Sequence, residues 1–124
     1  MAKKLLIAED EESLRALLVA TLQDDSRYGL ITSSDGEETL SLARDELPDL
    51  IFLDILMPKM DGIEVCRALK ADERTRGIKI VMITALTQET NRKAAMEAGA
   101  DDYVTKPFSP IALLEKVDQV LGGE

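Results

Sequence analysis

The sequence has 124 residues and a formal net charge of −9, with 45% hydrophobic and 31% charged residues. This length and balance are typical of one globular domain with one core. The acidic charge argues against direct binding to nucleic acid or to an anionic membrane surface. The absence of histidine excludes histidine catalysis and histidine metal ligands, and the single cysteine excludes an internal disulfide. No run is long enough for a signal peptide or a membrane span, so we expect a cytoplasmic protein.

The first half of the chain predicts two strand–helix units. An apolar run predicts a buried strand at residues 5–8, and a weaker run predicts an edge strand at residues 28–33. Apolar residues at helical spacing follow each run and predict two amphipathic helices. Residues 34–37 have the spacing of a capping box, so the second helix should begin there. The expected inward-facing residues are Leu14, Leu17, Leu18 and Leu22 in the first helix, and Leu40, Ala43 and Leu47 in the second.

The third unit contains the most informative stretch of the sequence. Residues 50–53 are all apolar and predict a strand buried on both faces, and Asp54 follows them directly. A third helix that buries Val65 and Leu69 should begin at Asp61. Open α/β folds bind ligands at the carboxyl ends of their strands, which makes Asp54 a candidate functional residue. A solvated aspartate that caps a turn is the plainer interpretation of this position.

Two further units complete the pattern. Apolar runs predict strands at residues 80–83 and 102–105. Thr87 should cap a fourth helix that ends near Gly99, because glycine tolerates the left-handed conformation that closes many helices. The Ser-Pro pair at 109–110 predicts the start of a fifth helix. The expected inward-facing residues of this helix are Ile111, Leu114, Val117 and Leu121. Five strand–helix repeats predict an α/β fold with a parallel sheet covered by helices on both faces.

Polar side chains follow four of the predicted strands, namely Glu9 and Asp10, Asp54, Thr84 and Lys106. In a doubly wound sheet these positions share one edge, where three carboxylates would repel one another and raise each other's pKa. A bound divalent ion is the simplest relief, and an all-oxygen ligand set favours Mg²⁺ over Zn²⁺. An ammonium and a hydroxyl beside such an ion suit a phosphoryl group. Asp54 could then attack phosphorus as a nucleophile.

Five motifs occur in chain order at these strand ends: residues 9–11 (EDE), 54–62 (DILMPKMDG), 84–85 (TA), 98–103 (AGADDY) and 106–108 (KPF). Together they are highly specific, and over residues 4–121 the chain resembles the receiver domain of two-component response regulators. The resemblance implies that residues 1–124 form a single receiver domain. It also implies a flavodoxin-like (βα)5 fold whose five-stranded parallel sheet has strand order 2-1-3-4-5.

The resemblance also implies the roles of the acidic residues. Asp54 looks like the phosphoacceptor, and Asp10 looks like a direct Mg²⁺ ligand. Glu9, where many relatives have Asp, would act on the metal through water. The backbone carbonyl of Leu56 would be the third protein ligand beside Asp10 and Asp54. Lys106 would contact the phosphoryl oxygens.

The resemblance further implies a switch. Thr84 and Tyr103 look like a pair in which the hydroxyl moves toward the phosphoryl group and the ring turns inward, and the peptide before Pro107 should be cis. The surface of the fourth helix, fifth strand and fifth helix would then change its affinity for an effector protein or domain, and a phosphorylation-dependent homodimer is compatible with this. The phosphoryl donor would be a histidine kinase or phosphotransfer protein. Its phosphohistidine must lie on another chain, because this chain has no histidine. The domain would be a signalling module that catalyses only its own phosphotransfer and slow autodephosphorylation.

Three other functions fit the sequence less well. A haloacid-dehalogenase-type phosphatase needs a second acid two residues after the nucleophile, and Leu56 occupies that position. A flavodoxin-like FMN carrier needs a phosphate-binding loop after the first strand, where residues 9–12 are all acidic and would repel phosphate. A degenerate receiver used only for docking would not need the complete set of acids, threonine and lysine.

The sequence also predicts a long-lived phosphoryl group. The apolar side chains of Leu56 and Leu86 cannot hydrogen-bond a water molecule and so cannot orient it for hydrolysis.

Overall fold

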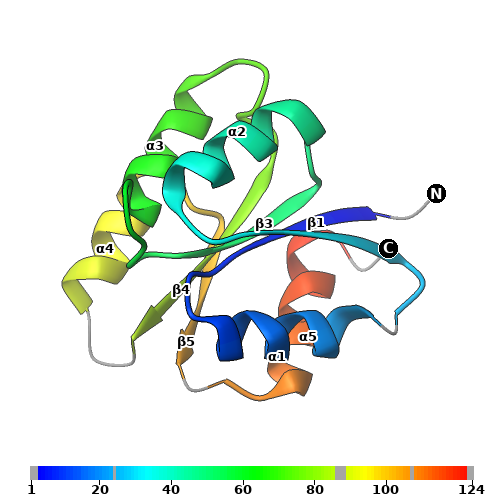
Figure 1. The fold of residues 1–124 in the computed structure, drawn as a ribbon. Helices are drawn as coiled ribbons and strands as arrows, with labels where there is room; N and C mark the ends of the chain where they lie inside the picture. The colour runs from blue at the N-terminus through cyan, green and yellow to red at the C-terminus, as the bar shows by residue number, and fades with distance from the viewer. Residues whose placement is uncertain (1–2, 24, 86–88, 107, 123–124) are drawn as a thin grey trace.

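The computed structural model describes residues 3–23, 25–85, 89–106 and 108–122, and for residues 84, 85 and 89–91 it describes the backbone alone. Strands and helices alternate along the described chain (Figure 1). The strands are β1 (Lys3–Ala8), β2 (Tyr28–Ser33), β3 (Leu50–Asp54), β4 (Lys79–Ala85) and β5 (Asp102–Lys106). The helices are α1 (Glu12–Gln23), α2 (Gly36–Glu46), α3 (Gly62–Ala71), α4 (Glu89–Glu97) and α5 (Pro110–Val120). Among the described residues, no helix is both long enough and apolar enough to cross a membrane.

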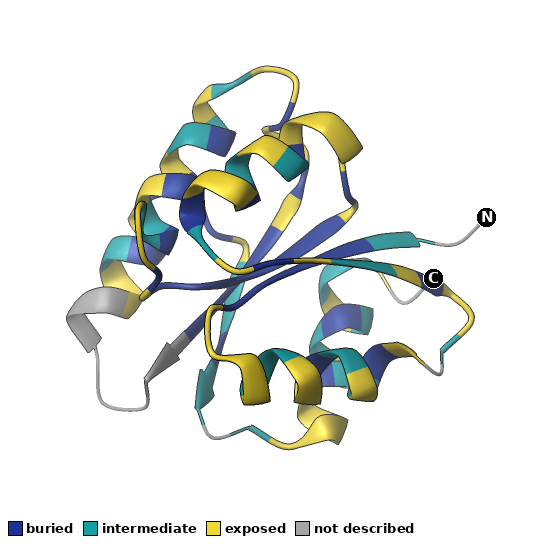
Figure 2. Cartoon of the chain, in the orientation of Figure 1, coloured by how far each residue is buried: buried dark blue, intermediate teal, exposed yellow. Residues whose placement is uncertain are grey.

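All five strands form one parallel sheet in the order β2-β1-β3-β4-β5, which confirms the predicted fold and strand order. Helices α1 and α5 cover one face of this sheet, and α2, α3 and α4 cover the other (Figure 1). The central strand β3 is buried at every position, as its continuous apolar run predicts (Figure 2). Its register with β4 pairs Asp54 with Ile83, so Asp54 lies at the carboxyl edge of the sheet.

The core is divided by the sheet into two apolar clusters. On the α2–α4 face, Leu6, Ile51 and Leu53 pack with buried residues such as Val65 and Leu69 of α3. On the α1–α5 face, strand residues such as Phe52 pack with Leu18, Leu22, Leu113 and Val117. Both faces of β3 are therefore sealed from water, and only its carboxyl end is left for polar chemistry.

Three leucine and isoleucine positions predicted to face inward are exposed instead. Leu17 is 45% exposed and neighbours the fully buried Leu18 on α1. Leu47 is 53% exposed because the chain leaves α2 there with a left-handed φ of 47°. Ile111 is 70% exposed, and Leu113 takes the inward position together with Val117. The prediction that Ile111 is the first inward-facing residue of α5 was therefore wrong.

The burial of Leu113 and the exposure of Ile111 predict that alanine substitutions at these two positions of α5 have unequal effects on stability. Leu113→Ala should lower the free energy of unfolding by about 2–5 kcal/mol, because it leaves a cavity in a closed core. Ile111→Ala should change it by less than about 0.5 kcal/mol, because the side chain is exposed. Urea unfolding of both variants measures the difference. Equal losses would mean that Ile111 also packs against the sheet.

The helix starts follow the sequence signals with one shift. Asp61 and Glu64 form the predicted capping box of α3, with backbone-to-carboxylate distances of 2.9 and 3.1 Å. For α2, however, the cap is Asp35, whose carboxylate accepts a hydrogen bond from the Glu38 amide at 2.8 Å. The predicted box at 34–37 was therefore one residue early. Gly99, with φ of 107°, follows α4 as expected, and Thr87 lies outside the described residues.

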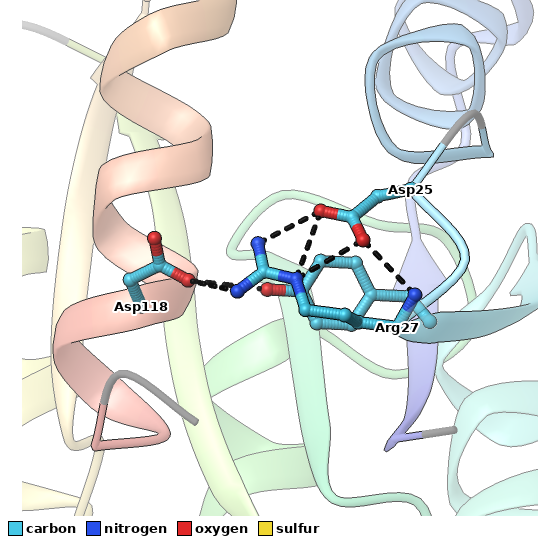
Figure 3. A network of polar contacts seen from close by, with 4 residues as sticks. Asp25, Arg27 and Asp118 are labelled. Carbon is cyan, nitrogen blue, oxygen red and sulfur yellow. Dashed lines mark hydrogen bonds and ion pairs between the residues drawn. The ribbon is translucent and has the colours of Figure 1, made fainter. Parts of the chain in front are cut away.

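Ion pairs tie α5 to the start of β2 at the amino edge of the sheet. The Arg27 guanidinium holds the Asp25 carboxylate at 2.8 Å and lies 3.3 Å from Asp118 of α5 (Figure 3). The Tyr28 hydroxyl also donates to Asp118, at 3.3 Å. Because the charged groups are largely solvent-exposed, each pair adds little stability. This cluster lies at the opposite edge of the sheet from Asp54.

Candidate functional site

The carboxyl edge of the sheet brings together acidic residues from two separate strands. Glu9 and Asp10 follow β1, and Asp54 ends β3. One carboxylate oxygen from each of the three lies within 4.8 Å of the others. Glu9 and Asp54 are buried, whereas Asp10 is exposed. The predicted convergence of these three acids is therefore present in the fold.

Lys106 places a positive charge among these carboxylates. It ends β5, where it pairs with Ala85 of β4, and its side chain is 34% exposed. Its Nζ lies 3.2 Å from Asp54 Oδ2 and 3.7 Å from Glu9 Oε1. Burial alone would lower the pKa of this ammonium, but Asp54 and Glu9 outweigh burial and raise it above its ordinary value. Lys106 therefore stays charged and faces the acidic cluster.

Glu9 is the most constrained acid of the cluster. Its Oε2 accepts a hydrogen bond from the Glu11 amide at 3.0 Å. Its Oε1 is buried and has no hydrogen-bond donor within the described parts of the chain. Burial, and then the neighbouring Asp54 carboxyl, raise the pKa of Glu9 to about 8. The Lys106 ammonium is 3.7 Å from this oxygen, beyond hydrogen-bond distance, so a cation between Glu9 and Asp54 would supply a closer positive partner.

The β3–α3 loop fixes the orientation of Asp54. The Leu56 amide donates to Asp54 Oδ1 at 3.1 Å, and the Gly62 amide donates to the Ile55 carbonyl at 2.8 Å. Gly62 is required here, because a Cβ at this position would lie 2.3 Å from the Asp54 carbonyl oxygen. Leu56 itself is 67% exposed. The proposed ligand role of its carbonyl remains a prediction.

The described residues place only one member of the predicted switch pair. Thr84 pairs with Thr105 through the backbone of β4 and β5, but its side chain lies outside the described part. The Tyr103 ring is half-buried against the α2–α4 face, with the Arg92 guanidinium 4.7 Å from its centroid. Pro107 and Leu86 lie outside the described residues, so the predictions that depend on them stay predictions.

The donor set of this cluster suits a hard divalent cation. The carboxylates of Glu9, Asp10 and Asp54 supply only oxygen atoms, and the buried Glu9 Oε1 has no hydrogen-bond donor in the described structure. Mg²⁺ and Ca²⁺ prefer such oxygen ligands, whereas Zn²⁺ sites use mainly nitrogen and sulfur. The residues present therefore fit Mg²⁺.

Sequence reasoning missed one residue that supports this cluster. Arg15 of α1 donates from its guanidinium to the Glu9 carbonyl at 2.8 Å, which ties the helix to the acidic loop. The only available signal was the helical spacing between Glu11 and Arg15, whose backbone groups form a hydrogen bond of 2.9 Å. That spacing does not predict a contact to the preceding loop.

Comparisons with known proteins agree with this fold. The family model for the response regulator receiver domain matches residues 5–118. The alkaline phosphatase synthesis transcriptional regulatory protein PhoP of Bacillus subtilis (strain 168) is 47% identical over 121 residues, which cover 98% of this chain and 49% of that protein. The chain therefore belongs to the response regulator receiver domain family, and it spans about half the length of this relative.

Solved structures of receiver proteins have the same fold. The chemotaxis response regulator CheY4 of Vibrio cholerae matches with a TM-score of 0.90 and 32% identity, over 98% of this chain and 100% of that one. The receiver domain of the sensor histidine kinase PA1611 from Pseudomonas aeruginosa PAO1 matches with a TM-score of 0.89 and 26% identity, over 98% and 99% of the chains. The structure of the PA1611 domain has a magnesium ion coordinated in its active site cleft.

Proposed function

We propose that this chain is a phosphorylation-dependent signalling switch in which Asp54 accepts a phosphoryl group from a partner histidine kinase or phosphotransfer protein. The observation that carries the proposal is the position of Asp54, buried at the end of β3 and 3.2 Å from the Lys106 ammonium. The family of the chain supports the signalling role. The donor histidine comes from the partner, because this chain has none.

In the proposed transfer, a carboxylate oxygen of Asp54 attacks the phosphorus atom of the partner's phosphohistidine. The P–N bond breaks, its electron pair leaves with the imidazole, and the imidazole takes up a proton. The Lys106 ammonium faces the carboxylate and can hold the incoming phosphoryl oxygens in place. The signal ends by hydrolysis: water attacks the same phosphorus, releases phosphate and restores the Asp54 carboxylate.

Asp10, Asp54 and the Leu56 carbonyl would hold Mg²⁺, with Glu9 acting through water. The all-oxygen cluster, and the buried Glu9 oxygen that has no hydrogen-bond donor among the described residues, support this assignment. When bound, Mg²⁺ neutralises the repulsion between the carboxylates and the phosphoryl oxygens. Asp10 is the exposed member of the cluster and is therefore the acid that an incoming ion meets first.

The output surface in this proposal lies on α4, β5 and α5. A surface cavity of about 370 Å³ lies beside β5 and α5, and its lining includes Tyr103, Phe108 and Lys116. Rotation of the Tyr103 ring, which packs on the α2–α4 face, would change the shape of the α4–β5 part of this surface when coupled to Thr84. The surface would then gain or lose affinity for an effector protein or domain, or for a second copy of the chain.

The metal assignment predicts that Mg²⁺ stabilises the protein. At about ten times its dissociation constant, Mg²⁺ should add ~1.4 kcal/mol to the free energy of unfolding, which raises the unfolding temperature by about 5 °C. Asp10→Asn should weaken this response, whereas Asp45→Asn on the exposed face of α2 should keep it. Thermal unfolding across a Mg²⁺ titration measures all three proteins. A wild-type unfolding temperature that is independent of Mg²⁺ would refute the site.

The function is tested by phosphorylation with a small donor. Incubation with acetyl phosphate and Mg²⁺ should add one phosphoryl group per chain, seen as a single mass increase of the intact protein. A chelator should prevent the addition. A protein that stays unmodified at saturating donor and Mg²⁺, or one modified equally with chelator, would contradict the proposed function.

A further inference from the structure

The turn that joins β2 to α2 contacts both segments that carry the acidic cluster. The Ser33 carbonyl accepts a hydrogen bond from the Glu9 amide at 3.1 Å. Three residues later, the Gly36 amide donates to the Pro58 carbonyl in the β3–α3 loop at 3.3 Å. Residues 33–36 therefore link the backbone beside Glu9 to the loop that follows Asp54. We call this segment the β2–α2 turn.

Gly36 allows this link because no side chain fits at its position. A Cβ atom there would lie 1.8 Å from the Met60 carbonyl oxygen and 2.6 Å from the Met60 carbonyl carbon. These are backbone atoms, so no side-chain rotation relieves the overlap. Gly36 is not among the residues with positive φ. Close approach of two backbones, rather than backbone conformation, is thus the reason for glycine at this position.

The loop that Gly36 contacts is itself tight. The Met60 amide donates to the Pro58 carbonyl at 2.8 Å, and Lys59 between them has φ of 69°. This is the hydrogen bond of a three-residue turn with positive φ, a strained conformation for a side-chain residue. The Lys59 ammonium also lies 3.7 Å from the carboxylate of Asp35, the cap of α2. The start of α2 therefore supports the shape of the loop through both backbone and side chain.

The loop cannot absorb a displacement at its far end. There the Gly62 amide is bonded to the Ile55 carbonyl at 2.8 Å, and the backbone approach at Gly62 leaves no room for a Cβ. A displacement of the Met60 backbone would therefore move residues 56–58. That segment includes Leu56, whose amide orients Asp54 and whose carbonyl is a proposed metal ligand.

We propose that Gly36 is a positioning residue for the metal site: it sets the distance between the Glu9–Asp10 segment and the Leu56 carbonyl so that one Mg²⁺ ion can bridge them. This inference rests on the proposed function, in which the cluster binds Mg²⁺. Gly36 itself would contact neither the ion nor the phosphoryl group. It acts through the Pro58–Met60 backbone.

Ion selectivity separates this role from a general loss of stability. Mg²⁺ requires near-ideal octahedral geometry with ligands at about 2.0–2.1 Å, whereas Ca²⁺ accepts irregular geometry at about 2.3–2.6 Å. A displaced Leu56 carbonyl should therefore weaken Mg²⁺ binding more than Ca²⁺ binding. Partial unfolding would weaken both to the same extent.

The test compares wild type, Gly36→Ala and Gly77→Ala by calorimetric titration with each ion below the unfolding temperature. Gly77 is a matched control, because a Cβ there meets nothing within 4 Å. In Gly36→Ala the dissociation constant for Mg²⁺ should rise by about tenfold or more, and that for Ca²⁺ by about threefold or less. Gly77→Ala should bind both ions like wild type.

Unchanged Mg²⁺ affinity in Gly36→Ala, or equal weakening of both ions, would overturn the inference while leaving the Mg²⁺ site intact. Absence of Mg²⁺ binding in wild type would overturn the proposed function and this inference with it. If Gly36→Ala does not fold, wild-type NMR decides the question. During a Mg²⁺ titration, the amide resonances of Gly36 and Leu56 should shift with the same midpoint concentration of Mg²⁺. The Gly77 amide resonance should not shift. A stationary Gly36 resonance would overturn the inference.

Discussion

Replacing Asp54 with asparagine should abolish phosphorylation by acetyl phosphate while leaving the protein folded. Asparagine keeps the size of the side chain and its hydrogen bond to the Leu56 amide, but its neutral amide cannot attack phosphorus. Intact-mass spectrometry of the variant, after incubation with donor and Mg²⁺, should show no addition. Because the neighbouring acids Glu9 and Asp10 remain in place, the loss would be specific to one carboxylate of the cluster.

The matched control for this experiment is Asp45→Asn, which removes an exposed carboxylate from α2. This variant should be phosphorylated like wild type. Thermal unfolding should show that both variants are folded under the assay conditions. Undiminished labelling of Asp54→Asn would show that another residue accepts the phosphoryl group and that the role given to Asp54 is wrong.

The phosphorylated protein should lose phosphate slowly, and two polar substitutions should speed the loss. Leu56 lies two residues beyond Asp54 and is 67% exposed, and its apolar side chain cannot orient an attacking water. Leu86 lies two residues beyond Thr84, outside the described residues, and has the same limitation. One orienting hydrogen bond is worth about 1–3 kcal/mol at a reacting centre, or roughly tenfold or more in rate. Leu56→Asn combined with Leu86→Glu should therefore raise the rate of phosphate release by about tenfold.

The control for this rate is Leu47→Asn. Leu47 is also an exposed leucine, but it ends α2 at a left-handed position that asparagine tolerates. Its rate of phosphate release should equal that of wild type at saturating Mg²⁺. If the double variant also releases phosphate at the wild-type rate, the lifetime is set by Mg²⁺ and Lys106 rather than by the two leucines.

The sheet could be predicted from the sequence because buried parallel strands leave a strong signal. Residues 50–53 are all apolar, and the structure buries the whole of β3. The bounds predicted for β2 agree with the structure at both ends. The strand ends then fix which polar residues share an edge, so the sequence alone groups Glu9, Asp10, Asp54 and Lys106.

Side-chain direction on the helices was less predictable. A leucine beside a buried leucine, such as Leu17 beside Leu18, fits a helical stripe but faces water when the sheet contacts only a narrow face. The contacts that support the site were equally hidden. The sequence predicts only that Gly36 lies at the start of a helix. The fold shows that its backbone lies against the Met60 backbone. Arg15 likewise contacts the Glu9 carbonyl across a loop, a contact without a sequence signal.

The most direct test of the account locates the phosphoryl group chemically in the wild-type protein. Borohydride reduces an aspartyl phosphate to homoserine: a first hydride displaces phosphate at the carbonyl carbon to give an aldehyde, and a second hydride with a proton gives the alcohol. Peptide sequencing by mass spectrometry then identifies the altered position. After phosphorylation with acetyl phosphate and Mg²⁺, homoserine should be found at position 54 and at none of the other aspartates. Homoserine at position 10, or a phosphorylated protein with unaltered Asp54, would contradict the account.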